Sequence, residues 1–189
     1  MEKITMTNEK PNRKLLAVLI AVYVLILLWV IVFKCNYNEG LHIEENSALT
    51  ILERLTYKII PFEKFILAVK GGGILALIEI LALIFNVVCF MPFGALLCFF
   101  TEKRGLIIAI GAFFSLSVEV FQLFSCWGGP DYIDLILNTL GAALGVLFYK
   151  HLRPRLTCKT INRITAALLA VFAPLATFAV INSIVNFPV

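Results

Sequence analysis

The chain has 189 residues and a net charge of +4, and 61% of its residues are apolar while only 15% are charged. Soluble domains are about 45–50% apolar and about 25% charged, and disordered chains contain few apolar residues, so both classes are excluded. Five dispersed cysteines without a CxxC pair and two distant histidines indicate neither a disulfide scaffold nor a metal centre. The composition predicts a small polytopic membrane protein.

Apolar runs mark the expected membrane spans. A spanning helix needs about 20 mostly apolar residues, because hydrocarbon offers no partner to an unpaired backbone group. The first run is too long for a signal peptide and lacks a small-residue cleavage site, so we expect an uncleaved anchor. We predict an all-α polytopic transmembrane helical bundle with five spans. They lie at 15–33, 74–100, 105–124, 132–148 and 164–185.

Basic residues predict the orientation of these spans, since cytoplasmic loops are rich in lysine and arginine. Residues 1–14, 101–104 and 149–163 together carry eleven basic and three acidic residues. Residues 125–131 and the tail after residue 185 carry no basic residue. This pattern predicts a cytoplasmic N-terminus and an outside C-terminus. It is the ordinary topology signal, so we expect no nucleic-acid partner, and membrane lipids are the partners expected of the spans.

The segment 34–73 is expected to be an extracytoplasmic loop. Within it Leu49, Leu52, Leu55 and Ile59 recur at near-helical spacing. This pattern fits a short amphipathic helix on the outer membrane surface and a plain packed loop helix equally well. Residues Cys35 and Cys126 are both expected outside, where they could pair.

Polar side chains inside the apolar spans need a separate explanation, because a carboxylate at the centre of a bilayer helix costs at least ~2.5–3.5 kcal/mol. In the third span Ser115, Glu119 and Gln122 follow the spacing i, i+4, i+7, which places them on one helix face. In the second span Glu79 and Asn86 are seven residues apart and also share a face. Such residues usually face the bundle or water and often mark function.

The fourth span continues the pattern. Asp131, Asp134 and Asn138 share a face with Gly141 and Gly145. Small residues four apart let another helix approach closely, so this face is expected to pack against the third span. The predicted orientation places the polar faces of all three spans in the outer half of the membrane, capped by the turn 126–130.

Structural roles are alternatives for each of these residues. Asn86, Gln122 and Asn138 could bridge helices through hydrogen bonds. Asp131 could cap the fourth span, because aspartate is favoured at helix N-termini. Glu119 is harder to explain in this way, since a buried carboxylate is either protonated or neutralises a cation.

The spacing of these residues resembles that of the VanZ-like family over roughly residues 60–148. The family pattern has Asn and then Pro-Phe-Gly in one helix, Ser-x-x-x-Glu-x-x-Gln in the next, and Asp-x-x-Asp-x-x-x-Asn-x-x-Gly-x-x-x-Gly in the third. Members usually carry an arginine just before the first Asp of the last pattern, where this chain has Pro130 after Trp-Gly-Gly. The matching residues are Asn86, Pro92, Phe93, Gly94, Ser115, Glu119, Gln122, Asp131, Asp134, Asn138, Gly141 and Gly145.

The resemblance implies that residues 74–148 form a VanZ-like core of three helices. The family's founding role is resistance to teicoplanin, a lipoglycopeptide-type antibiotic that acts outside the membrane on cell-wall precursors. The resemblance therefore implies a factor at the outer face of the cell membrane. Its expected partners are a glycopeptide antibiotic or a cell-wall precursor at the outer leaflet.

A membrane-embedded enzyme on a lipid-linked or cell-wall substrate is the alternative. Glu119 and Asp134 are its candidate catalytic carboxylates, with Glu119 as general acid or base, and the two aspartates could hold a divalent cation. No His, Cys or Lys joins these faces, so a nucleophilic triad is not expected, and the residues identify no cofactor. Polar residues confined to one side also disfavour a transporter site at the midplane. The candidate binding residues are Asn86, Ser115, Gln122, Asp131 and Asn138.

Overall fold

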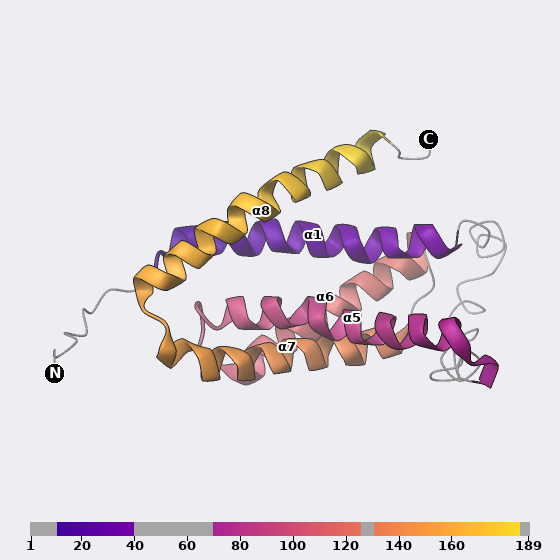
Figure 1. The fold of residues 1–189 in the computed structure, drawn as a ribbon, viewed down its shortest axis with the longest axis horizontal. Coiled ribbons are helices and arrows are strands. Elements are labelled where there is room, and N and C mark those ends of the chain that lie inside the picture. The colour runs from indigo at the N-terminus through magenta and orange to yellow at the C-terminus, as the bar shows by residue number, and fades with distance from the viewer. Residues whose placement is uncertain (1–10, 40–69, 126–130, 186–189) are drawn as a thin grey trace.

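The computed structural model describes residues 11–39, 70–125 and 131–185, which form helices and no strand. Five of the helices in these ranges are long and apolar enough to cross a membrane, so the expected all-helical class with five spans is confirmed there. The direction in which they cross stays a prediction. The elements are α1 (Arg13–Glu39), α5 (Gly73–Leu97), α6 (Arg104–Ser125), α7 (Tyr132–Leu152), the 3₁₀ turn η1 (Arg153–Arg155) and α8 (Cys158–Val185) (Figure 1).

The helix ends differ from the predicted apolar runs. Helix α8 begins at Cys158 rather than at 164, because the Thr157 hydroxyl accepts a hydrogen bond from the Thr160 backbone N–H at 3.1 Å and so caps a polar first turn. Helix α5 ends at Leu97 rather than at 100, where the chain tightens into a turn. The expected loop helix, the turn 126–130, a Cys35–Cys126 bridge and the side chain of Glu79 lie outside the described residues.

Two glycines fix the start of α5. Gly72 and Gly73 have φ angles of +66° and +70°. This left-handed region costs glycine little and strains residues that carry a Cβ. The chain can therefore change direction here immediately before the membrane-spanning part of α5.

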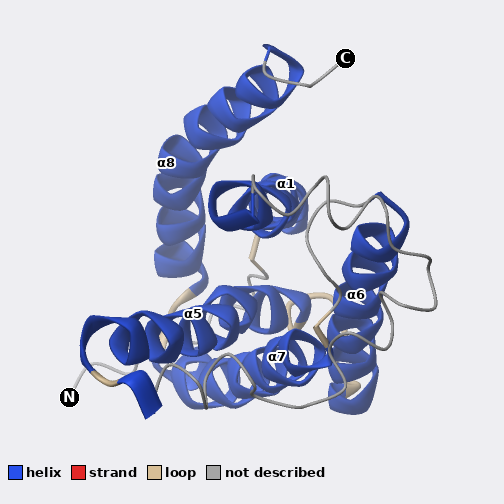
Figure 2. Cartoon of the chain, turned by 90° about the vertical axis from the view of Figure 1, so that its right-hand side faces the viewer, coloured by secondary structure: helices blue, strands red, loops and turns tan. Residues whose placement is uncertain are grey.

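Gly141 and Gly145 of α7 pack against α5, so the prediction that their face packs against the third span, α6, is wrong for these glycines, although Asn138 on the same face contacts α6. A Cβ added at Gly141 or Gly145 would overlap backbone carbonyls of α5, and one added at Gly94 would overlap the backbone of Ala142. Both helices therefore carry glycine at the contact, Gly94 on α5 and Gly141 and Gly145 on α7, and this lets the two backbones come close together. Helix α6 meets α7 less closely, with Gly111 beside the Ala142 side chain. Figure 2 shows α5 and α7 side by side and α6 beyond α7.

An aromatic core joins α1 to α5, with Ile110 and Phe114 of α6 packed against it. Phe90 and Phe93 of α5 are buried against Tyr23 and Leu27 of α1. The Tyr23 hydroxyl also donates a hydrogen bond to the Cys89 backbone carbonyl at 2.6 Å. Large side chains therefore hold α1 in place, whereas backbone contact joins α5 to α7.

Helix α8 is attached mainly to α1. Near their starts the Asn12 backbone N–H donates a hydrogen bond to the Asn162 Oδ1 at 2.9 Å, and Phe172 packs on Tyr23 with 5.9 Å between ring centroids. Beyond this contact α8 inclines away from the other helices (Figure 1).

The outer surface of the bundle is apolar. Phe113, Ile74 and Phe124 are 72%, 66% and 65% exposed. A soluble monomer rarely exposes large contiguous apolar patches. These faces suit contact with membrane lipid.

Candidate functional site

The carboxylate of Glu119 lies where the end of α6 meets the start of α7. Its Oε2 accepts a hydrogen bond from the Asp131 backbone N–H at 2.7 Å, and the residue is only 8% exposed. Asp131 caps α7, since its Oδ1 accepts the Ile133 backbone N–H at 3.0 Å. The capping role is therefore confirmed. Both carboxylates are at the positive end of the α7 dipole, which favours negative charge.

Ser115 and Asn138 form a second link between α6 and α7. The Asn138 side-chain amide donates a hydrogen bond to the Ser115 Oγ at 2.9 Å. Ser115 is 0% exposed and Asn138 is 5% exposed. The two buried side chains are thus hydrogen-bonded to each other, and the expected bridging role of Asn138 is confirmed.

Asn86 connects α5 to the same face of α7. Its side-chain amide donates a hydrogen bond to the Asp134 Oδ1. Asn86 is buried and Asp134 is partly buried. A hydrogen bond to a carboxylate is stronger than one between neutral groups, so this contact is expected to stabilise the packing of α5 on α7. The bridging role of Asn86 is confirmed as well.

These contacts define the polar cluster, in which three helices meet on one face of α7. Gln122 is buried about one turn further along α6 than Glu119. The predicted convergence is therefore present for six of the candidate residues, and Gln122 is shown only to be buried on α6. Their catalytic or binding roles stay predictions. The polar cluster consists of Asn86, Ser115, Glu119, Asp131, Asp134 and Asn138.

The chemistry of the polar cluster is that of hydrogen bonding and of carboxylates. In the described ranges no group of three His, Cys, Asp or Glu side chains is placed to hold a metal ion. The Asn86 amide donates a hydrogen bond to an oxygen of α7, and the Asn138 amide donates one to an oxygen of α6. The cluster is thus preorganised by contacts between its own members.

Sequence reasoning missed a second feature at the other end of the bundle. A cavity of about 570 Å³ lies between the start of α1, the turn after α5, the start of α6 and the end of α7. In the sequence its basic residues indicate only the membrane topology. They lie in three segments, at the start of α1, before and at the start of α6, and at the end of α7. Their expected location on one side of the membrane was the only sign in the sequence that these segments meet.

The described helices define a multi-pass α-helical membrane protein whose buried polar residues gather on one helix face. The chain belongs to the VanZ/LLP1 family, whose model matches residues 20–153. It is 28% identical over 148 residues to "Protein VanZ" of Enterococcus faecium, and the match covers 77% of this chain and 80% of that protein. No solved structure gives a significant match. The matched residues contain the whole polar cluster.

Proposed function

We propose that this protein acts at the outer face of the cell membrane and lowers susceptibility to teicoplanin-type glycopeptide antibiotics, or alters how cell-wall precursors and envelope lipids interact there. Membership of the VanZ/LLP1 family supports this proposal. The basic residues at 1–14, 101–104 and 149–163 also support it, because their distribution predicts that the start of α7 faces outward.

One observation carries the proposal: the Glu119 carboxylate is buried at the α6–α7 junction and hydrogen-bonds the Asp131 backbone at 2.7 Å. A membrane protein rarely retains such a group without a functional reason, because burying a carboxylate is costly. Asp134 lies about one turn along α7 from its N-cap, Asp131. Carboxylates held in this way can accept hydrogen bonds from the amide and hydroxyl groups of a glycopeptide or a cell-wall precursor.

Susceptibility testing of a teicoplanin-sensitive host that expresses the chain tests the proposal. We expect the wild type to lower susceptibility, and Glu119→Ala and Asp134→Ala to lose this effect while membrane abundance stays normal. Ser117→Ala is the matched control, because Ser117 lies two residues from Glu119 on α6 but is exposed and bonds only the Phe113 carbonyl in the described structure. It should keep the effect.

Two results would contradict the proposal. One is an unchanged susceptibility on expression of the wild type and on deletion of the gene from its own host. The other is full protection by Glu119→Ala and Asp134→Ala at normal abundance, which would leave the polar cluster a purely structural contact.

A membrane-embedded enzyme is the second candidate, favoured by the placement of Glu119 and Asp134 against one face of α7. In this mechanism Glu119 transfers a proton to or from a lipid-linked or cell-wall substrate. Glu119→Gln keeps the shape and one acceptor oxygen but cannot act as an acid or base. Loss of the phenotype in Glu119→Gln supports the enzyme, and an intact phenotype rules out this role.

A further inference from the structure

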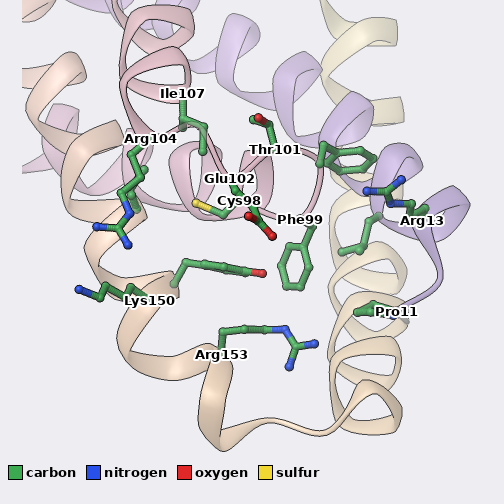
Figure 3. A pocket seen from close by; sticks show the side chains of 14 residues that line it. Pro11, Arg13, Cys98, Phe99, Thr101, Glu102, Arg104, Ile107, Lys150 and Arg153 are labelled. Atoms are coloured by element: carbon green, nitrogen blue, oxygen red, sulfur yellow. The ribbon is translucent and has the colours of Figure 1, made fainter. Parts of the chain in front are cut away.

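The cavity opposite the polar cluster has the size of a ligand site. Its volume of about 570 Å³ falls in the range of roughly 300–1,000 Å³ typical of small-molecule pockets. Figure 3 shows the side chains that surround it, which come from the start of α1, the turn after α5, the start of α6, the end of α7 and η1. Because it lies at the ends of membrane-spanning helices, it faces the level of the lipid headgroups rather than the hydrocarbon centre.

The charge around this cavity is strongly unbalanced. Arg13, Arg104, Lys150 and Arg153 line it, and Glu102 is the one acidic residue among its described lining residues. None of the four basic side chains forms an ion pair with another described residue. Arg153 instead donates hydrogen bonds to the Leu156 carbonyl at 3.1 Å and to the Cys158 sulfur at 3.9 Å. The cavity is therefore an electropositive site without an internal counter-charge of equal size.

The inner wall of the cavity is apolar. Its accessible apolar surface comes from Phe99, Phe100 and Tyr149, which are partly buried or exposed, while Leu16, Ile107 and Val146 in the same lining are almost completely buried. Phe99 packs edge-on against Tyr149, with 4.8 Å between the ring centroids. A small soluble anion would use only the charged rim. A ligand with both an anionic head and a hydrocarbon part would use the rim and the wall together.

We propose that this cavity binds the phosphate headgroup of an anionic membrane lipid. Guanidinium groups match phosphate oxygens in geometry and charge, and basic pockets between membrane helices are suited to anionic headgroups. The orientation predicted from the sequence assigns the cavity to the cytoplasmic leaflet. The lipid site does not depend on the function proposed for the polar cluster, which lies at the other ends of α6 and α7.

Calorimetric titration of the purified full chain in an uncharged detergent at about 0.15 M salt, where the Debye length is about 8 Å, tests this proposal. The probe is dioctanoyl phosphatidic acid, compared with zwitterionic dioctanoyl phosphatidylcholine and with soluble glycerol 3-phosphate. We expect saturable binding of the phosphatidic acid. Binding of the other two should be at least about tenfold weaker, because each lacks either the net charge or the hydrocarbon that the cavity accommodates.

Two double variants with equal charge loss separate the cavity from general attraction. Arg104→Gln/Lys150→Gln should weaken phosphatidic acid binding by about 10- to 30-fold. Lys159→Gln/Arg163→Gln removes two exposed charges of α8 that do not line the cavity. It should change binding by less than about twofold, because exposed charges outside the site are screened.

A gain-of-binding variant guards against loss through misfolding. Glu102→Gln removes a carboxylate from the cavity lining and should tighten phosphatidic acid binding, a result that misfolding does not produce. Three outcomes would overturn the proposal: equal weakening by both double variants, equal affinity for glycerol 3-phosphate and the lipid, or no tightening in Glu102→Gln. The second outcome would identify a soluble phosphate as the ligand.

Discussion

The two ends of the α5–α7 bundle use polar residues in opposite ways. At the polar cluster, carboxylate, amide and hydroxyl groups bond one another across touching helices, as Ser115 does with Asn138. At the cavity, four basic side chains surround a space of about 570 Å³ and are not ion-paired within the described structure. The first arrangement fixes the positions of helices, and the second leaves charge available to a ligand. In the described structure the side chains of the polar cluster bond one another, whereas the basic side chains of the cavity have no acidic partner, and Arg153 bonds only neutral groups.

The largest expected effect comes from breaking the close backbone contact between α5 and α7, which lies between the polar cluster and the cavity. Gly145→Val places a side chain where the α5 backbone lies. Because backbone cannot move aside as a flexible side chain can, we expect a loss of about 3 kcal/mol or more of stability. The measurement is the folded, monodisperse fraction in detergent. Gly105→Ala is the control, since nothing lies within 4 Å of the added Cβ, and a similar loss there would show that the helix contact is not the cause.

A double-mutant cycle at Asn86 and Asp134 sharpens the description of the polar cluster. Asn86→Ala leaves the Asp134 carboxylate without this amide donor, so we expect a loss of about 1.5–3 kcal/mol. The double Ala variant should cost less than the two single variants together, because the residues are coupled. The free energy of unfolding in micelles measures this. The same cycle between Asn86 and Lys150 should be additive; coupling there would contradict the independence of the two ends.

Capping by Asp131 gives a smaller effect. Asp131→Ala removes the acceptor of the Ile133 backbone N–H and should cost about 1 kcal/mol of stability. Asp131→Asn keeps a capping oxygen and should cost only a fraction of that. If Asp131→Asn nevertheless loses the teicoplanin phenotype at normal abundance, the carboxylate charge has a role beyond the cap.

The smallest effect is a change in the reactivity of Cys98 at the cavity. Burial raises the pKa of the Cys98 thiol, and the Arg104 charge partly opposes this shift. A raised pKa leaves less thiolate at a given pH, so maleimide labelling should reach its half-maximal rate at a higher pH than for free cysteine. Arg104→Gln removes the opposing charge and should move this midpoint higher still. Arg163→Gln is the control, and a midpoint that falls in Arg104→Gln would contradict the placement of that charge.

The membership of the polar cluster followed from the sequence because helical periodicity decides which residues share a face. Ser115 and Glu119, or Asp134 and Asn138, must lie on one side of any regular helix. The neighbour of the glycine face did not follow. Gly141 and Gly145 indicate a close approach without saying which helix approaches, and the answer depends on Gly94 in α5.

The cavity could not be predicted for a related reason. Its walls come from segments near residues 11–16, 98–107 and 146–153, which only the tertiary arrangement brings together. Each segment alone shows basic residues beside an apolar helix end, a pattern that membrane topology already explains. The cavity arises from the way the helix ends are arranged in space, and the spacing of residues within one segment does not determine that arrangement.

Helix α7 has a mechanical consequence for the whole molecule. Its first turn carries Asp134 and its last turn carries Lys150, about 24 Å apart along the helix axis. Gly141 and Gly145 interlock it with the α5 backbone between these points. Sliding α7 along its axis would therefore have to drag α5 with it, so we expect the two helices to move as one unit between the two membrane faces.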